Sequence, residues 1–300
     1  MDMTQNKCCR HGASLRRRRR RRRKILRSII FSCSIIAVAV FVAVGSSMIR
    51  SGDGRTNRYD VEAGNNTYDN AVIENSKISE KNKIQNNQSM LDDIMNSTQY
   101  PKQLKDLALK NEEALEFVYD YPAEHVKEHT IDLTEEASMD SVPLFVQWDK
   151  RWGYEKYSGN FFAASGCGPT TLSMVVVYLT HNREASPIAV AKYSKEAGYS
   201  VDGSGSSWTL ISEGCRHYGI KAKTVALDES RMKAELDAGH PIVINVGPGD
   251  FTDTGHFMVI TGYDDEGFSI NDPNSIEKSG KRWLFRNISS QIRAVWSMYV

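Results

Sequence analysis

The sequence predicts an α+β fold in its C-terminal half, because segments with helical patterns come first and segments with strand patterns follow. Between residues 169 and 239, apolar residues fall at helical spacing between capping residues and glycines. From Pro241 onward, short apolar runs of strand length alternate with turn residues. We therefore place one mixed domain at residues 142–300, with its helices packed on an antiparallel sheet.

The first 27 residues are strongly basic, with twelve Lys and Arg, eight of them consecutive arginines at 16–23, against a single acidic residue. Since the whole chain carries only +1, the remaining residues sum to −10. Residues 28–49 contain no charged residue and are long enough to cross a bilayer core of about 30 Å as a helix. Because basic residues stay on the cytoplasmic side, the pattern predicts a cell-membrane anchor with residues 1–27 inside and the rest outside.

Two other interpretations of this N-terminal region remain open. A signal peptide cleaved at residues 44–47 has the same order of basic and apolar stretches, although this apolar run exceeds the usual length of about 7–15 residues. Clustered arginines also neutralise phosphates. Basic residues beside a membrane span, however, set topology without any other ligand, and the rest of the chain is acidic. We therefore expect no nucleic-acid partner.

The segment between the anchor and the domain divides into two parts. Residues 50–99 are rich in Asn, Ser, Asp and Lys and contain only isolated apolar residues, which predicts a disordered tether. Residues 100–141 contain apolar residues at helical spacing before Pro122. This second part is expected to form a helical extension that packs on the domain.

Within the domain, capping residues mark each expected helix. Residues 169–180 start with a proline and are apolar on most sides, as in a buried helix. Residues 186–197 follow a Ser-Pro cap, residues 207–218 carry an apolar stripe, and residues 228–239 run from an Asp cap to a glycine. The expected strands are 221–226, 242–246, 257–263, 268–271 and 294–299, of which 257–263 and 268–271 form a hairpin.

Cys167 lies two residues before Pro169, the proline that is expected to begin the buried helix. The partial positive charge and free N–H groups of a helix N-terminus stabilise a thiolate, which is the nucleophilic form of cysteine. Cys167 is therefore the predicted nucleophile. A disulfide with Cys215 is the alternative in an oxidising compartment, but Cys215 falls in an apolar helical stripe, where free cysteine is often buried.

His256 is the best candidate for the base among the seven histidines, because it follows Gly255 and opens an apolar strand. A hairpin bend near residues 264–265 places position 256 opposite 272 or 273. Asp272 is therefore expected as a cross-strand neighbour that orients the imidazole. Asn271 is the alternative if the register shifts by one residue.

Several of these segments occur together in an order that resembles a known family: Gln147, Ser165-Gly166-Cys167-Gly168-Pro169-Thr170, Gly255-His256-Phe257, Gly262-Tyr263-Asp264 and Asn271-Asp272-Pro273. The chain resembles the stand-alone branch of the bacterial, bacteriocin-processing double-glycine leader peptidases, family thirty-nine of the cysteine peptidases. The resemblance covers about residues 142–300 and implies a papain-like fold.

By position, this resemblance implies that Cys167 is the nucleophile, that His256 is its base and later the acid, and that Asp272 orients the imidazole. It also implies that Gln147, with the backbone N–H of Cys167, stabilises the oxyanion. The predicted function is thus a membrane-anchored, extracytoplasmic thiol protease that hydrolyses peptide or protein substrates through a thioester, without cofactor or metal. The alternatives are a hydrolase of peptidoglycan stem peptides and an inactive peptide-binding domain with Cys167 bridged to Cys215.

Overall fold

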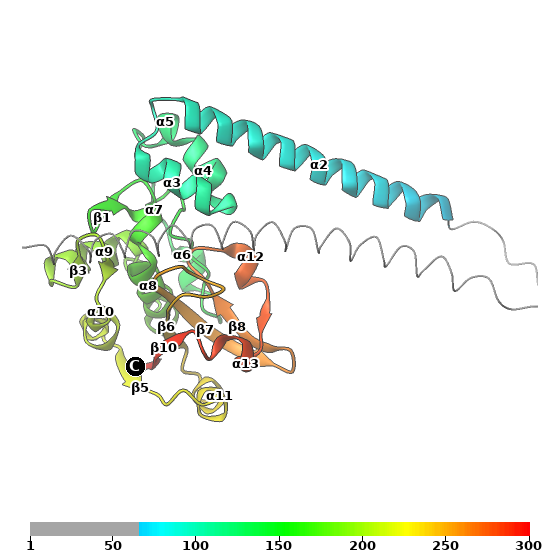
Figure 1. Cartoon of the computed structure of the whole chain (residues 1–300). Coiled ribbons are helices and arrows are strands. Elements are labelled where there is room, and N and C mark those ends of the chain that lie inside the picture. The colour runs from blue at the N-terminus through cyan, green and yellow to red at the C-terminus, as the bar shows by residue number, and fades with distance from the viewer. Residues whose placement is uncertain (1–65) are drawn as a thin grey trace, which may run out of the picture. The chain divides into compact units, whose positions relative to one another are not determined.

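A computed structural model describes residues 66–300, with side chains from residue 79 onward (Figure 1). The predicted basic tail, the membrane span and residues 50–65 of the predicted tether lie outside the described residues. In the part of the chain that is described, no helix combines the length and the apolar character that crossing a membrane requires. Residues from Tyr68 to Val300 form one compact unit.

A long helix, α2 (Asn66–Asn96), occupies most of the predicted tether. This helix contradicts the disorder expected for residues 66–96. Its last turns carry a narrow apolar stripe, in which Ile94 is fully buried and Met90 and Leu91 pack on the helices that follow. The spacing of these three residues is helical, but the polar residues around them dominate the composition. Packing on a neighbouring apolar surface therefore stabilises the last turns of this helix.

The extension is helical, as expected, but it is broken into short pieces. These are α3 (Lys102–Lys110), η1 (Glu112–Ala114), α4 (Leu115–Tyr119), α5 (Tyr121–Glu124) and α6 (Thr134–Ala137). The first break is at Asn111, whose backbone is extended and whose side chain accepts a hydrogen bond of 3.0 Å from the Glu113 N–H. Such a side-chain bond competes with a continuous helix. Pro122 lies in the first turn of α5 and does not end a helix.

The main sheet has six antiparallel strands in the order β5-β10-β6-β7-β8-β9. All five predicted strands are present, whereas β9 was not predicted. Their bounds are β5 (Lys221–Thr224), β6 (Ile242–Val246), β7 (His256–Asp264), β8 (Gly267–Asn271), β9 (Arg282–Trp283) and β10 (Ile292–Tyr299). Two small hairpins, β1 (Lys156–Tyr157) with β2 (Asn160–Phe161) and β3 (Ser200–Val201) with β4 (Gly205–Ser206), are the other paired strands of the described residues.

The helices of the domain include α8 (Cys167–Thr180), which packs against β7. The Ser186 and Asp228 caps are confirmed at α9 (Pro187–Glu196) and α11 (Glu229–Asp237). The predicted helix 207–218 is instead divided into α10 (Thr209–Ser212) and η2 (Gly214–Tyr218), because the backbone of Glu213 leaves the helical region. The domain also contains the short helices α7 (Phe162–Ser165), α12 (Ile276–Ser279) and α13 (Phe285–Ile288).

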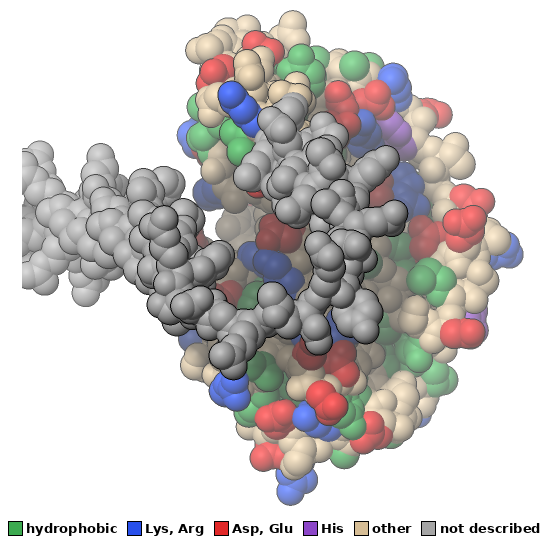
Figure 2. Space-filling view, turned by 90° about the vertical axis from the view of Figure 1, so that its right-hand side faces the viewer, with side chains coloured by type: hydrophobic (Ala, Val, Ile, Leu, Met, Phe, Trp, Pro, Cys, Tyr) green, Lys and Arg blue, Asp and Glu red, His purple; other side chains and the backbone are tan. Residues whose placement is uncertain are grey.

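The sheet is buried on both faces. Along β7, Phe257 and Val259 belong to the core that contains the α8 side chains, whereas Met258 and Ile260 belong to the core that contains Met232 of α11. This alternation follows from the two-residue period of a strand. The architecture confirms the predicted α+β class. On the face shown in Figure 2, acidic and basic side chains of the described residues are interspersed along the visible rim.

Candidate active site

Cys167 is the first residue of α8, and it is partly exposed. The glycines on either side of it permit close packing. A Cβ atom on Gly166 would lie 2.6 Å from the Phe162 ring, and one on Gly168 would lie 2.6 Å from Ser206 Oγ. The helix begins two residues earlier than predicted, so Pro169 is its third residue, where a missing N–H still costs no helical hydrogen bond. The thiol therefore lies at the N-terminus, as expected.

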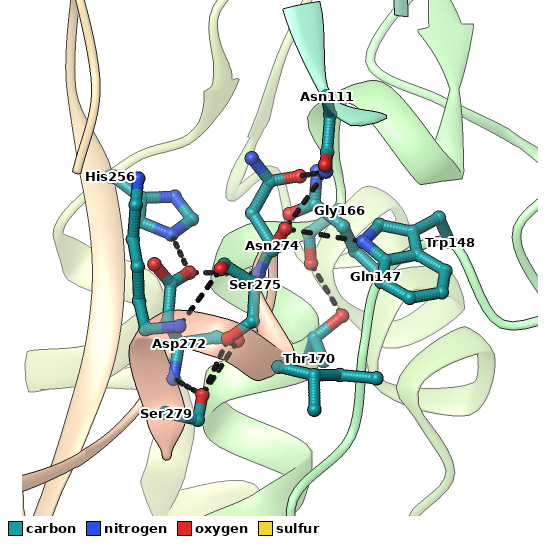
Figure 3. Close-up of polar contacts among 12 residues, drawn as sticks. Asn111, Gln147, Trp148, Gly166, Thr170, His256, Asp272, Asn274, Ser275 and Ser279 are labelled. Atoms are coloured by element: carbon teal, nitrogen blue, oxygen red, sulfur yellow. Dashed lines mark hydrogen bonds and ion pairs between the residues drawn. The ribbon is translucent and has the colours of Figure 1, made fainter. Parts of the chain in front are cut away.

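Thr170 stabilises the first turn of helix α8. Its backbone N–H and its Oγ1 hydroxyl both donate to the carbonyl oxygen of Gly166, at 3.0 and 2.8 Å (Figure 3). The Thr170 side chain is fully buried. These two bonds fix the peptide that precedes Cys167, and so they fix the position from which the thiol projects.

His256 and Asp272 form a buried pair. The Nε2 atom of His256 lies 2.7 Å from Oδ1 of Asp272, and the two side chains are 7% and 1% exposed (Figure 3). Bonding through Nε2 leaves the other ring nitrogen, Nδ1, for Cys167. The expected proximity of these two residues is thus confirmed.

The route by which Asp272 reaches His256 differs from the predicted one. The turn centres one residue later than expected, at 265–266, and a bulge in β7 shifts the register, so that Val259 pairs with Asn271. The ladder ends there, and Asp272 approaches the imidazole from the turn beyond β8. Asn271, the alternative, instead donates through Nδ2 to the carbonyl oxygens of residues 142 and 143 at 3.1 and 3.0 Å.

The surroundings of Cys167 and His256 favour their charged forms. Burial alone would raise the pKa of the thiol, but a hydrogen bond to His256, the charge of that imidazole, and backbone groups of Phe257 and Gly168 together lower it. Burial alone would lower the pKa of His256, but the charge and hydrogen bond of Asp272, with those of Cys167, raise it to about 10. Both shifts stabilise a thiolate–imidazolium pair.

Gln147 is buried at the same site. Its Nε2 donates to the carbonyl oxygen of Ala163 at 2.7 Å, and its backbone N–H donates to that of Pro273 at 2.7 Å. It lines the same cavity as Cys167 and His256. An amide nitrogen carries two N–H groups, so one remains for a ligand at this position. The structure therefore brings together all four predicted site residues.

A cleft extends on both sides of the thiol. Two cavities of about 670 and 610 Å³ are both lined by Cys167, and they share Asn160, Ala164, Thr254 and Gly255. An extended chain could thus lie across the sulfur with parts on either side. Of these shared residues, only Gly255 could be connected with the site from the sequence, through its place before His256. Asn160 of β2 and Ala164 of α7 reach the site only through the tertiary fold.

Both cysteines that the structure describes are free thiols. Cys215 is fully buried, and burial raises its pKa to about 11. The alternative in which Cys167 is bridged to Cys215 is therefore not supported. Among the described residues, no group of three or more His, Cys, Asp or Glu side chains is placed to hold a metal ion.

The fold and the site together define a mixed domain in which a cysteine at a helix N-terminus lies beside a buried His–Asp pair. The family model described as Peptidase_C39 like family matches residues 139–300, more than half of the chain. The chain belongs to this family, which agrees with the resemblance that its motifs indicate.

Two solved structures are similar to this chain. The peptidase domain of Streptococcus ComA, a bifunctional ABC transporter involved in a quorum-sensing pathway, is 18% identical, with 53% of this chain and 96% of that chain covered and a TM-score of 0.39. A putative C39-like peptidase from Bacillus anthracis is 17% identical, with 53% and 95% covered and a TM-score of 0.34. No curated protein matches.

Proposed function

We propose that this protein is a cysteine peptidase that uses Cys167, His256 and Asp272 as its catalytic residues. The observation that carries this proposal is the buried contact of 2.7 Å between His256 and Asp272, beside a partly exposed thiol whose pKa is lowered. An orienting carboxylate, a base and an activated sulfur are the groups that nucleophilic cleavage of an amide requires.

In the proposed reaction, the Cys167 thiolate attacks the carbonyl carbon of the scissile peptide bond. The backbone N–H of Cys167 and the second N–H of Gln147 donate to the oxyanion that forms. Collapse of the tetrahedral intermediate breaks the C–N bond, and the His256 imidazolium gives its proton to the leaving amine. His256 then deprotonates a water molecule that attacks the thioester, which releases the acid and restores the ion pair.

For the location, the proposal rests on the sequence alone. Residues 28–49 would anchor the protein in the cell membrane, residues 1–27 would lie in the cytoplasm, and the helical extension (100–141) and the peptidase domain (142–300) would face outward. In intact cells, a membrane-impermeant protease added outside should degrade the domain. A domain that is protected until the cells are lysed would contradict this orientation.

The peptidase proposal is tested by incubating the purified protein with a mixed peptide library and identifying new termini by mass spectrometry. Wild type should cleave peptides, and Cys167→Ala should not. Purified peptidoglycan provides a parallel arm, because an outward-facing domain would meet the cell wall. Release of stem peptides without cleavage of linear peptides would make the protein a cell-wall hydrolase. Cleavage in neither arm by wild type would overturn the proposal.

A further inference from the structure

The larger cavity beside Cys167, of about 670 Å³, is lined by mainly uncharged residues. Most of its residues are small or uncharged, and they include Gly205, Ser206 and Asn245. Arg293 is the one Lys, Arg, Asp or Glu side chain among the residues that line it. Among described residues, the guanidinium has one hydrogen bond, from Nη1 to the Ser290 carbonyl oxygen at 2.8 Å, and no ion pair.

A β-bulge in β10 places the Arg293 side chain at this cavity. The pairing of β10 with β6 shifts between Ile292 and Ala294, so Arg293 is the extra residue of a bulge. Bulges re-aim a side chain and are common beside active sites. The guanidinium then packs over Gly247, where a Cβ atom would lie only 2.8 Å from Nε of Arg293. A glycine at 247 thus leaves room for the arginine at the cavity.

We infer that this cavity binds a carboxylate of the substrate through Arg293, an inference that rests on the proposed peptidase function. An unpaired guanidinium matches a carboxylate in a bidentate arrangement, which a lysine or a neutral side chain cannot reproduce. Trp208, 48% exposed on the same cavity, offers an apolar surface beside it. The substrate class is therefore a peptide with an acidic residue, or a free C-terminal carboxylate, on this side of the scissile bond.

The test compares matched peptides once a cleaved sequence is known. At each position flanking the scissile bond, Glu is exchanged for Gln, and a peptide acid is compared with its amide to separate the two sources of the carboxylate. Wild type should prefer the carboxylate at one position by about tenfold in kcat/KM, equivalent to about 1.4 kcal/mol. Arg293→Met, which keeps the length without the charge, should abolish that preference.

Arg286→Met serves as the control, because Arg286 is exposed on α13 and does not line the cavity. It should retain the preference. Equal preference in wild type and Arg293→Met, or no preference at any position in wild type, would overturn the inference while leaving the peptidase function intact. An inactive wild type would instead refute the proposed function.

A second inference concerns the turn that carries Asp272 and rests on different contacts. Within this turn, the Asn274 N–H donates to Asp272 Oδ1 at 2.8 Å, and the Asp272 N–H donates to Ser279 Oγ at 2.9 Å (Figure 3). The other carboxylate oxygen of Asp272, Oδ2, is buried and has no hydrogen-bond partner among the described residues. The hydrogen bonds within the turn therefore hold this carboxylate in position, since Oδ2 contributes none.

The extension holds this turn from outside. Asn111 Nδ2 donates to the Asn274 carbonyl oxygen at 2.8 Å (Figure 3), and the Ser275 hydroxyl donates to Glu113 Oε1. The backbone N–H groups of Ile276 and Glu277 donate to Glu113 Oε2 at 2.7 and 3.0 Å. More than 160 residues of sequence separate the two sides of these bonds. The segment matched by the family model begins at residue 139, so both anchoring residues lie outside it.

We infer that Glu113 is a positioning residue: it holds the turn so that Asp272 meets His256, and the extension is thereby part of the active site. Its carboxylate makes charge-assisted bonds to three donors of residues 275–277, and these are stronger than neutral ones. A displacement of catalytic groups by about 1 Å can reduce a rate by as much as about a hundredfold. Glu113→Ala should therefore lower kcat by about ten- to a hundredfold with little change in KM.

The test adds a measurement that does not need peptidase activity, which is the pH profile of Cys167 alkylation mapped by mass spectrometry. In Glu113→Ala the thiol pKa should rise, because a misplaced Asp272 stabilises the imidazolium less. Glu113→Gln, which keeps one acceptor oxygen, should fall between alanine and wild type. Glu116→Ala, an exposed site three residues further on, is the matched control and should match wild type.

If Glu113→Ala does not fold, Asn111→Asp replaces it, since an aspartate still caps η1 but cannot donate to Asn274. It should lower kcat and raise the thiol pKa in the same direction. A normal kcat and alkylation profile in Glu113→Ala, or an equal loss in Glu116→Ala, would overturn the inference. An ordinary thiol pKa together with no activity in wild type would instead overturn the proposed function.

Discussion

His256 and Asp272 are sixteen residues apart in the sequence, yet Nε2 and Oδ1 are 2.7 Å apart in a buried site. The bond depends on two features of the β7–β8 hairpin, its bulge and the turn that follows its second strand. Burial lowers the pKa of His256, and the charge of Asp272 is the largest of the causes that raise it. This carboxylate is therefore central to the chemistry that we propose.

Replacing Asp272 by Asn should lower kcat by about a hundredfold or more, because the amide cannot stabilise the imidazolium and can favour the wrong tautomer. His256→Ala should cost more, since proton transfer is lost altogether. Steady-state kinetics on one cleaved peptide would check the order. An Asp272→Asn variant as active as wild type would show that the pair is only structural.

Cys167→Ala should abolish cleavage while the melting temperature stays within about 2 °C of wild type, because the thiol is partly exposed. Cys215→Ser provides the opposite case. It places a hydroxyl in a fully buried site and should reduce the free energy of unfolding by about 1–3 kcal/mol. Differential scanning calorimetry and activity assays would separate the two effects.

The pH profile should show an active plateau between two ionisations. The lowered thiol pKa sets the acid limb, below which the nucleophile is protonated, and the loss of the imidazolium near pH 10 sets the alkaline limb. The rate of Cys167 alkylation should therefore rise with a midpoint below pH 9, the ordinary pKa of the thiol. A midpoint at or above that value would contradict the ion pair.

The free energy of unfolding should also depend on the ionisation of Cys167 and His256. The raised pKa of His256, taken alone, contributes fully to stability below its ordinary value of 6.5, and this contribution is lost as the pH rises toward 10. The lowered pKa of Cys167 contributes in the opposite sense up to its ordinary value of 9, so the net loss of stability from the pair should fall between about pH 9 and 10. Urea unfolding at several pH values should show this loss in wild type, and a smaller one in Asp272→Asn. Equal slopes in the two proteins would argue against the raised pKa.

Gly168→Ala should destabilise the domain by about 1–3 kcal/mol, because the added methyl would lie 2.6 Å from Ser206 Oγ, whose hydroxyl also bonds Tyr157. Gly262→Ala is a suitable control, since nothing lies within 4 Å of the added Cβ. That variant should change stability by less than about 0.5 kcal/mol. Chemical denaturation of both variants would provide the comparison.

Local signals predicted much of the fold. The Ser186 and Asp228 caps, and the apolar runs that became β6 and β7, each depend on a few neighbouring residues. Helix α2 was missed because its burial depends on a partner surface provided by residues 104–118. The breaks at Asn111 and Glu213 depend on single backbone conformations, which residue patterns do not specify.

The proposed catalytic residues could be identified because each has a chemical signature: a cysteine before a helix, a histidine at a strand start and an acid beyond the hairpin. Arg293 and Glu113 could not. One depends on a bulge, and the other on contacts with residues more than 160 positions away. The roles inferred for both residues depend on tertiary structure, and no local sequence pattern indicates them.

The bonds from Asn111 and Glu113 also affect how the protein should be produced. A truncated version that begins at residue 139, where the family match begins, would retain the central sheet and helix α8. It would lack Asn111 and Glu113, whose side chains hydrogen-bond the turn that carries Asp272. Weak turnover by such a fragment would say little about the native protein, and recombinant work should start upstream of residue 100.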